Sequence, residues 1–432
     1  MNVKLYFILL LGILLLKVSC TDKSEEPMVF AIGGTPNEVD YWEGLAEKFA
    51  ERSGIKLEIR RHPTDTDLRR QGLVISLAAG ESDPDIFLMD IAWLGQFAAS
   101  GWLEPLDHCL EHGTIKTESF FEEVVLTANR YRDTLIAFPV YIDGGLLYYR
   151  SDLLAKYGYD GPPDKWAELV KYAEVVQAGE RMDGKDFYGF VWQGAQYEGL
   201  ICNFLEFAVA NNGGISFHGD SIQINCRANI EALNFMRNLI EKYNISPPNT
   251  FIEMKEEETR LFFQRGRALF MRNWPYAWSL MQQEDSEVKD RVGIAALPFF
   301  EGGRRASTLG GWHVGISRFS DQKMEALEFL KYILSYEVQK SLAQDLGWNP
   351  GRQDIYSDKE VLEELPHFAE LKEIFEGATA RPTLPYYTQI SEVLQRYINA
   401  VLAGEMDSEK ALAEAEVEAQ KIINRYEGHR DF

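Results

Sequence analysis

From residue 28 onward, short apolar segments of strand character alternate with segments whose apolar residues recur at helical spacing. The run MVFAIGG precedes the helical stretch NEVDYWEGLAEKFAERSG, and the strand-like KLEIRRH precedes TDTDLRRQGLVISLAAG, which Gly80 ends. Later strand candidates are PDIFLMD, ALFMRNW and VGIAALPFF, together with LIAFPVYIDGGLLYYR, which is either two strands or one strand interrupted by Gly144 and Gly145. This alternation predicts an α/β protein.

The chain is too long for one ordinary hydrophobic core, and its 432 residues predict two domains. Beyond Tyr149 the predicted helices become longer, and the C-terminal third is mostly helical. No segment rich in proline, glycine or serine divides the chain in two. We therefore expect the backbone to cross between two lobes more than once.

The first twenty residues, MNVKLYFILLLGILLLKVSC, have the order of an export signal: Lys4 near the start, an apolar centre and the small residue Ser19. The apolar run is shorter than the ~20 residues of a membrane-spanning helix, so residues 1–19 are predicted to be a signal peptide. Cys20, directly after the expected cut, resembles the lipobox cysteine of bacterial lipoproteins and is predicted to be lipidated. Lys17 departs from that pattern, because lipoproteins usually carry leucine there. The alternative is a plain secretory signal followed by a chance cysteine.

Residues 20–27 are polar and charged, and we interpret them as a lipidated tether. No later stretch approaches the length of a membrane span, so any membrane attachment is expected at Cys20 alone. The mature protein is exported in both interpretations. With the lipid it is a cell-envelope lipoprotein, either periplasmic or on the outer face of the cytoplasmic membrane.

Composition and charge exclude several classes of protein. Hydrophobic residues make up 46% of the chain and aromatic residues 12%, which excludes a disordered protein. The formal net charge is -23 and no basic block occurs, so no nucleic-acid partner is expected. We interpret the acidic runs MKEEETR and SEKALAEAEVEAQK as solvated helix faces rather than as a cation site.

The three cysteines after Cys20 are Cys109, Cys202 and Cys226. Cys202 and Cys226 could form a disulfide in an oxidising compartment. The favoured interpretation is that the cysteines are small buried residues, because Cys202 lies in the apolar run GLICNFLEF. The chain lacks a C-x-x-C motif and its histidines are scattered, so neither a metal nor a cofactor is expected.

The motifs of several common enzyme classes are missing from the sequence: H-E-x-x-H, a P-loop, G-x-G-x-x-G and G-x-S-x-G. A secreted glycosidase could still be built from two carboxylates that the fold brings to ~5 to 10 Å. Asp90 and Asp143 are the candidates for such a pair. No other nucleophile or base is indicated, and the main expectation is a protein without catalytic activity.

Aromatic residues lie beside polar residues and glycine or proline in several predicted turns. A sugar offers apolar C–H faces and a rim of hydroxyls, so its site needs flat aromatic surfaces edged by carboxylate, guanidinium and amide groups. Each tryptophan alone is more simply explained by core packing, but their joint placement in turns favours a binding site. The segments concerned are VYIDGG, RNWPYAW, TLGGWHVGIS, GWNPGRQDIY and RPTLPYY.

Seven segments occur in an order that resembles the extracellular solute-binding proteins of bacterial and archaeal ABC importers, in the large sugar-binding group. Within that group the chain is most similar to trehalose/maltose-binding proteins. The segments are FAIGGTPNEVDYW, SDPDIFLMDIAWLGQFAASGWLEPLD, FPVYIDGGLLYYRSDLLAKYG, GRALFMRNWPYAW, STLGGWHVGIS, GWNPGRQDIYSD and RPTLPYYTQISEVLQRYINAVLAG.

The resemblance implies a two-lobe periplasmic-binding-protein fold of type II, like that of maltose-binding protein, with an interlobe ligand cleft and a hinge of about three crossings. By analogy, residues 28–140 and 307–346 form lobe 1, and residues 141–306 and 347–432 form lobe 2. Hinge closure would trap a disaccharide, trehalose-like or maltose-like, for delivery to the permease subunits of an ABC transporter in the membrane. The protein is expected to act as a monomer. A sugar sensor for a membrane receptor would bind its ligand in the same way.

The resemblance also implies the residues of the ligand site. Three alternatives stay open: Arg70 in place of Arg69, Asn37 in place of Glu38, and an interlobe salt bridge between Asp143 and Arg381 in place of ligand contacts. The implied polar contacts are Glu38, Arg69, Asp90, Asp143 and Arg381, the implied stacking surfaces are Tyr141, Trp274, Tyr276 and Trp312, and the backbone of Gly311 would allow a close approach that a side chain would block.

Overall fold

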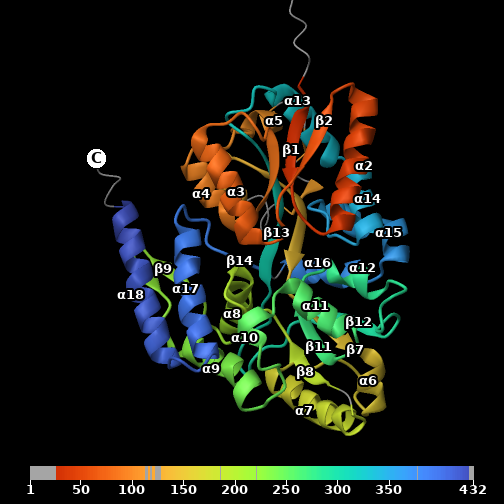
Figure 1. The fold of residues 1–432 in the computed structure, drawn as a ribbon, viewed down its shortest axis with the longest axis vertical. Coiled ribbons are helices and arrows are strands. Elements are labelled where there is room, and N and C mark those ends of the chain that lie inside the picture. Colours follow the sequence, from red (N-terminus) through yellow and green to blue (C-terminus); the bar gives the residue numbers. More distant parts are fainter. Residues whose placement is uncertain are drawn as a thin grey trace, which may run out of the picture.

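The computed structural model describes residues 26–111, 115–116, 119–121, 128–184, 186–219, 221–376 and 378–427. These residues form two larger β-sheets, one above the other in Figure 1, with helices packed around each. The predicted signal peptide, residues 1–19, and the lipidation site Cys20 lie outside the described residues. Within the described residues, no helix has both the length and the apolar character needed to cross a membrane.

The first sheet has the strand order β14-β13-β3-β1-β2, and β6 also pairs with β13. β1 is parallel to β2 and β3, whereas β13 runs antiparallel to β3 and β6. This register places Trp312 of β13 opposite Asp90 of β3 and opposite Tyr141 of β6. The strands are β1 (Met28–Ile32), β2 (Leu57–Arg61), β3 (Ile86–Asp90), β6 (Phe138–Gly144), β13 (Thr308–Ile316) and β14 (Thr379–Ala380).

Helices cover the first sheet, and their ends follow local sequence signals. α2 starts with a proline after Thr35 and ends at Gly54, whose φ of 75° suits glycine. Asp65 caps the start of α3, because its side chain accepts a hydrogen bond from the Leu68 amide at 3.0 Å. The helices around this sheet are α2 (Pro36–Ser53), α3 (Thr66–Ala79), η1 (Ile91–Trp93), α4 (Leu94–Ala99), α5 (Asp107–Glu111), α13 (Lys323–Ile333) and α14 (Tyr336–Leu346), with the small hairpin β4 (Arg130–Tyr131) and β5 (Thr134–Leu135).

The second sheet has the strand order β12-β7-β11-β8. Its core joins Trp166, Phe204 and Phe270 to the C-terminal helices through Leu394. The strands are β7 (Leu146–Arg150), β8 (Tyr188–Val191), β11 (Ala268–Asn273) and β12 (Val292–Ala296). Around them lie α6 (Ser151–Lys156), α7 (Trp166–Met182), α8 (Glu198–Ala210), the hairpin β9 (Ser216–His218) and β10 (Ser221–Gln223), α9 (Arg227–Glu241), α10 (Thr250–Glu253), α11 (Glu256–Gln264), α12 (Ala277–Met281), α17 (Tyr387–Leu402) and α18 (Ser408–Glu427).

The backbone passes between the two sheets more than once, as the length of the chain predicted. The segment LIAFPVYIDGGLLYYR is two strands: β6 belongs to the first sheet, and β7, which starts after Gly145, belongs to the second. A second passage joins β12 to β13, and a third follows α14. That third passage leads into η4 (Gln353–Ser357), α15 (Lys359–Glu364) and α16 (Phe368–Glu376), which share a core with residues of β7 and β11. The lobe limits at residues 140, 306 and 346 stay a prediction.

All three described cysteines carry free thiols. Cys109 and Cys202 are buried and Cys226 is half-buried. The disulfide considered between Cys202 and Cys226 is therefore absent from the described residues, and the interpretation of Cys202 as a small buried residue is confirmed.

Candidate ligand-binding site

A cavity of about 440 Å³ lies between the two sheets and is lined by elements of both. Every residue that the sequence predicted for the ligand site lines this cavity, although its role in binding a ligand stays a prediction. The volume is within the ~300 to 1,000 Å³ of small-molecule sites. The predicted residues brought together here are Glu38, Arg69, Asp90, Tyr141, Asp143, Trp274, Tyr276, Gly311, Trp312 and Arg381.

The cavity has two walls. We call the side formed by α2, α3, β3, β6 and β13 the first wall, and the side formed by α8, α11 and the end of β11 the second wall. The first wall holds Glu38, Asp65, Arg69, Asp90, Tyr141, Asp143, Gly311 and Trp312; the second holds Glu198, Cys202, Lys255, Glu256, Glu257, Trp274 and Tyr276.

Arg69 is the arginine of α3 that lines the cavity. Its guanidinium is anchored by the backbone, since Nε donates to the Pro63 carbonyl at 3.1 Å and Nη2 donates to the Thr64 carbonyl at 3.2 Å. Its Cζ lies 4.1 Å from the ring centre of Trp312, which is a cation–π contact. Arg70 points elsewhere and pairs with Glu392 of α17 at 3.1 Å. The alternative of Arg70 in the site is therefore wrong.

Glu38, rather than the neighbouring Asn37, lines the cavity. Its Oε2 accepts a hydrogen bond from the Thr35 amide at 3.0 Å, which is half of a capping box at the start of α2. Burial is the main reason why the pKa of Glu38 is raised to about 7, against a lowering by that hydrogen bond and by Arg69. Asn37 is exposed, and its Oδ1 accepts from the Thr35 hydroxyl at 2.5 Å.

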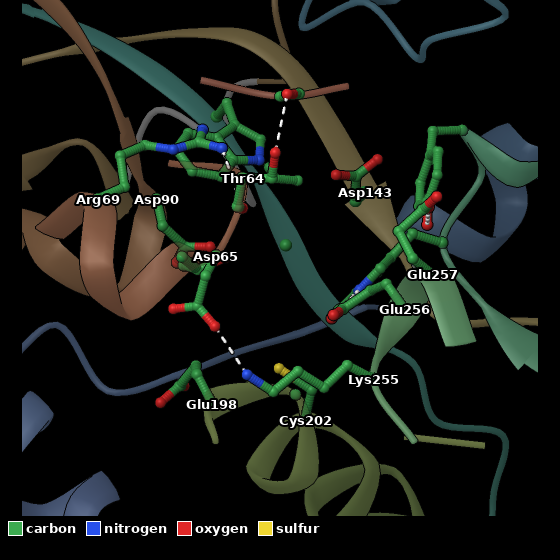
Figure 2. Close-up of a pocket in the computed structure, with 18 of the residues that line it drawn as sticks. Thr64, Asp65, Arg69, Asp90, Asp143, Glu198, Cys202, Lys255, Glu256 and Glu257 are labelled. Carbon is green, nitrogen blue, oxygen red and sulfur yellow. Dashed lines mark hydrogen bonds and ion pairs between the residues drawn. The ribbon is translucent and has the colours of Figure 1, made fainter. Parts of the chain in front are cut away.

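Asp143 lines the cavity, and in Figure 2 it lies between Arg69 and Asp90 on one side and Glu256 and Glu257 on the other. No hydrogen-bond donor reaches its carboxyl among the side chains and backbone amides that the structure describes. The pKa of Asp143 is raised to about 7, mainly by burial and in addition by the negative charges of Asp90 and Glu38. Asp143 is thus a carboxyl that a ligand donor could still satisfy.

Arg381, in the chain between β14 and α17, ties the two walls together. Its Nη2 lies 3.0 Å from Asp90 Oδ1, and its Nη1 lies 2.9 Å from Glu198 Oε1. The expected alternative of a salt bridge between Arg381 and Asp143 is therefore wrong. Asp90 also accepts from the Ala92 amide at 2.8 Å, so both Asp90 and Arg381 are already held in place.

Gly311 lies where β13 passes closest to β6. Its φ is +129°, and a Cβ at this position would lie 2.5 Å from the Tyr141 carbonyl oxygen. The close approach expected at Gly311 is therefore an approach of two strands, and it brings Trp312 beside Tyr141. The Tyr141 ring packs in turn on Trp348, with ring centres 4.1 Å apart.

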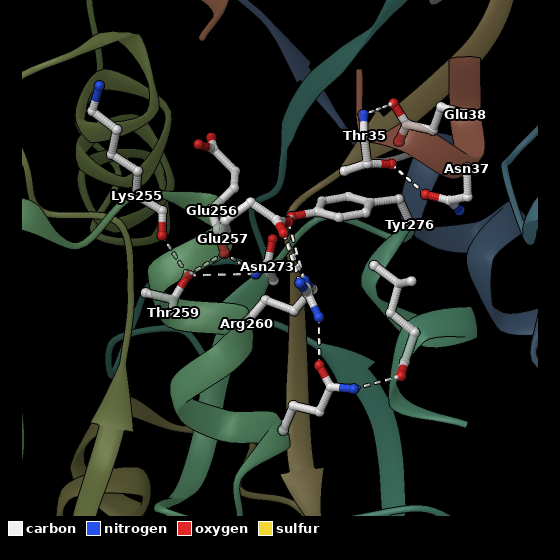
Figure 3. A network of polar contacts seen from close by, with 12 residues as sticks. Thr35, Asn37, Glu38, Lys255, Glu256, Glu257, Thr259, Arg260, Asn273 and Tyr276 are labelled. Atoms are coloured by element: carbon white, nitrogen blue, oxygen red, sulfur yellow. Dashed lines mark hydrogen bonds and ion pairs between the residues drawn. The ribbon is translucent and has the colours of Figure 1, made fainter. Parts of the chain in front are cut away.

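The second wall is built by the start of α11 and the end of β11. Trp274 Nε1 donates to Glu256 Oε1 at 3.3 Å, and the Tyr276 hydroxyl donates to Glu257 Oε1 at 2.7 Å. Glu257 also forms an ion pair with Arg260 at 2.7 Å, one helical turn further along α11 (Figure 3). These contacts fix both aromatic rings of the wall through carboxylates.

Sequence reasoning missed the acidic start of α11. The run MKEEETR was interpreted as a solvated face, but Glu256, Glu257 and Glu258 line the cavity, so that interpretation is wrong for these residues. The signal that could have found them is the strand ALFMRNW directly after α11. A helix that is joined to the next strand by a short turn and packs against it runs in the opposite direction. The start of the helix therefore lies near the end of the strand, which is at the site.

A charged contact across the cavity was also missed. Lys255 Nζ lies 2.7 Å from Asp65 Oδ2, which joins the residue before α11 to the residue before α3 (Figure 2). The sequence places these residues 190 positions apart and offers no signal for their pairing. Including Asp65, eight carboxyl side chains line the cavity against three cations: Glu38, Asp65, Asp90, Asp143, Glu198, Glu256, Glu257 and Glu258 against Arg69, Lys255 and Arg381.

Comparisons with known proteins agree with this architecture. Residues 35–340 match the bacterial extracellular solute-binding protein family. A probable ABC transporter-binding protein of Deinococcus radiodurans is 33% identical over 423 residues, which cover 97% of this chain and 99% of that protein.

Solved structures give the same picture. Maltose-bound MalE3 of T. maritima superposes with a TM-score of 0.86 at 37% identity, covering 92% of this chain and 99% of that one. An ABC transporter solute-binding protein of Thermotoga lettingae bound with α-D-tagatose superposes with a TM-score of 0.81 at 26% identity, covering 92% and 100%. The expected two-lobe fold, like that of maltose-binding protein, is confirmed.

Proposed function

Because the chain belongs to the family of bacterial extracellular solute-binding proteins, as its sequence motifs predicted, we propose that it captures a sugar for an ABC importer. The ligand proposed is a disaccharide of the maltose or trehalose kind. The relative bound with maltose supports this choice more strongly than the relative bound with tagatose, because its identity to this chain is 37% rather than 26%.

The observation that carries the proposal is the pairing of aromatic faces with a free carboxyl in one cavity. Trp312 on the first wall and Trp274 on the second wall both line the cavity, and Asp143 lies there without a donor among the described residues. Apolar sugar faces pack on indole rings, and sugar hydroxyls donate to carboxylates. A ligand with two linked rings would use both walls.

Capture by hinge closure is proposed on the same grounds. Besides the bridge through Arg381, two ion pairs join segments around the first sheet to segments around the second: Lys255 with Asp65 at 2.7 Å, and Arg70 with Glu392 at 3.1 Å. Opening the cleft by hinge bending would break both pairs, and closing would remake them. The closed form would then deliver the sugar to permease subunits in the membrane.

The remaining parts of the proposal concern the N-terminus. We propose that residues 1–19 direct export and that the Cys20 thiol carries the lipid that keeps the protein at the cell envelope. Cys20→Ala followed by cell fractionation tests the anchor. Release of the variant from the membrane fraction is the expected result, and full retention would contradict lipidation.

The decisive experiment for the function is calorimetric titration of the purified protein with maltose, trehalose, sucrose and tagatose. We expect saturable one-to-one binding of a disaccharide, with no glucose released above a control without protein. Glucose release on prolonged incubation would instead support the glycosidase alternative with Asp90 and Asp143. Binding of tagatose alone would contradict the disaccharide ligand.

A further inference from the structure

A fully buried ion pair lies directly behind Trp274 and away from the cavity surface. Arg272 is 1% exposed and Glu206 is 2% exposed. Arg272 Nε donates to Glu206 Oε2 at 2.9 Å, and Arg272 Nη2 lies 2.5 Å from Glu206 Oε1, so the contact is bidentate. Arg272 Nη1 also donates to the Gln193 side-chain oxygen at 3.2 Å. The guanidinium is therefore held in one orientation.

The guanidinium that is held in this way supports the tryptophan. The Arg272 Cζ lies 3.8 Å from the ring centre of Trp274, so the flat cation covers a face of the indole. Two further features limit the orientation of the ring. Its Nε1 donates to Glu256 at 3.3 Å, and its edge lies so close to Gly310 of β13 that a Cβ there would be 3.2 Å away. Arg69 and Trp312 form the corresponding pair on the first wall, with Cζ 4.1 Å from the ring centre.

Glu206, which anchors Arg272, contacts two of the segments in which the backbone passes between the sheets. Glu206 Oε1 accepts a hydrogen bond from the Thr308 amide at 3.2 Å, at the first residue of β13. A Cβ at Gly145, between β6 and β7, would collide with the carboxylate of Glu206 and the guanidinium of Arg272. The Ser307 hydroxyl donates to the Gly145 carbonyl at 3.1 Å and joins the two passages.

We propose that Arg272, anchored by Glu206 at the two strand passages, is a positioning residue that holds the Trp274 ring in place for stacking on the ligand. The identity of the ligand in this inference rests on the proposed function. The placement of the Trp274 ring by Arg272 is independent of it. Arg272 itself does not line the cavity, and it acts through Trp274. Lysine at this position would keep the charge beside Glu206 but lose the flat surface behind the indole.

The first test needs no ligand. The protein is labelled with 5-fluorotryptophan, and the fluorine resonances of Trp274 and Trp312 are assigned with Trp274→Phe and Trp312→Phe. We expect Arg272→Lys to broaden or double the Trp274 resonance, because the ring then has more than one orientation, and to leave the Trp312 resonance sharp. A single sharp Trp274 resonance in folded Arg272→Lys would overturn the proposal.

Arg150→Lys is the matched control. Arg150 lies on the neighbouring strand β7, is 6% exposed and makes a bidentate ion pair with Asp152 at 2.7 and 2.6 Å, but it does not line the cavity. This variant is expected to leave both resonances unchanged. Glu206→Gln keeps Arg272 but removes its charged anchor, and it carries the same expectation as Arg272→Lys, so the proposal can be tested if either variant does not fold.

The second test measures maltose affinity in a double-mutant cycle with Trp274→Ala. Arg272→Lys is expected to weaken maltose binding about tenfold in the parent and less than about twofold in the Trp274→Ala background, since residues that act through one contact are not additive. An equal loss in both backgrounds would show a general structural role and overturn the proposal. The cycle uses trehalose if the parent binds trehalose and not maltose. If the parent binds no disaccharide of the panel, the proposed function fails while the fluorine spectra still decide the role of Arg272.

Discussion

The two walls of the cavity hold their aromatic rings in different ways. On the second wall, Trp274 and Tyr276 donate hydrogen bonds to Glu256 and Glu257. The polar groups of the rings and the carboxylates are thus hydrogen-bonded to each other. On the first wall, the Arg69 Cζ lies 4.1 Å from the ring centre of Trp312, and Trp93 makes a T-shaped contact with the same ring, with ring centres 5.5 Å apart.

As a result of this difference, two carboxyls of the first wall accept few hydrogen bonds or none within the described part of the chain. Asp143 accepts no hydrogen bond from the described residues, and Glu38 accepts one from the Thr35 backbone amide. The pKa of both groups is raised to about 7, and burial is the main cause. Trp274 and Tyr276 of the second wall are therefore bonded to Glu256 and Glu257 before a ligand arrives, whereas the first wall keeps carboxyls that a sugar can satisfy.

The largest effect is expected where the two walls are joined. Arg381→Met leaves Asp90 and Glu198 near each other without their shared cation. Because the Arg381 side chain is 3% exposed and the carboxylates are 14% and 12% exposed, the free energy of unfolding should fall by about 3 kcal/mol, the lower end for breaking a buried ion pair. Urea denaturation measures this.

The control for Arg381 is Arg396→Met. Arg396 pairs with Glu418 on the surface, with side chains 53% and 39% exposed. Its loss should change the free energy of unfolding by less than about 1 kcal/mol. Equal effects of the two variants would mean that the bridge between the walls adds no more than a surface pair.

The next effect concerns Asp143 and pH. Its folded pKa of about 7 is above the ordinary 3.8, so the folded protein keeps a proton that the unfolded chain loses. The contribution of Asp143 to stability is thus fully present below about pH 4 and is lost as pH rises through about 7. Sugar hydroxyls donate to the ionised carboxyl, so affinity should rise with pH in this window and binding should release protons.

Asp143→Asn separates these two roles. Maltose affinity should fall by about 1.5 to 3 kcal/mol, the range for hydrogen bonds to a charged group, and its pH dependence should become weaker. Near neutral pH the ligand-free variant should be more stable than the parent. Asp160→Asn, at an exposed position, is the control and should change neither quantity. An unchanged affinity in Asp143→Asn would exclude this carboxyl from the ligand contacts.

Trp312→Ala compares the aromatic surfaces of the walls. It should weaken maltose binding by about 1 to 3 kcal/mol, the range for burying a large apolar side chain. Trp274→Ala should have an effect of similar size, since the rings face one cavity from two sides. A thermal melt run beside the titrations distinguishes binding from packing. A lowered melting temperature with unchanged affinity of the folded Trp312→Ala protein would assign Trp312 to the core.

The smallest effect is expected at the contact across the cavity. The side chains of Lys255 and Asp65 are 38% and 30% exposed, so Lys255→Met should lower the free energy of unfolding by less than about 1 kcal/mol. The difference from the parent should disappear at about 1 M salt, where exposed charges are screened. A larger loss that persists in salt would indicate that this pair carries much of the interlobe contact.

The sequence predicted most of the first wall because its residues lie in regular elements or at their ends. Asp90 ends a strand, Arg69 lies on a helix whose phase could be read to within one residue, and Trp312 lies in a glycine-rich strand. The sequence could not choose between Arg69 and Arg70, because only tertiary packing decides which of two adjacent helical residues faces the cavity.

The second wall was predicted less completely. Trp274 and Tyr276 stood out as aromatics in a turn, but Glu256 and Glu257 were hidden in a charged run of the kind that usually covers a solvated helix face. The partners of Arg381 also depended on distances between remote segments: it is 291 positions from Asp90 and 183 from Glu198. Pairings of this kind are set by the packing of the lobes and leave no local pattern.

A crystal structure of the protein with maltose would show whether the first wall leaves Asp143 for the ligand. We expect one glucosyl face on Trp312, the other on Trp274, and a sugar hydroxyl within about 3 Å of an Asp143 carboxyl oxygen. The carboxylates of Glu256 and Glu257 should keep their bonds to the aromatic rings of the second wall. Maltose bound outside the cavity, or bound inside it with Asp143 still lacking a donor, would exclude Asp143 as the carboxyl that the first wall keeps for the ligand.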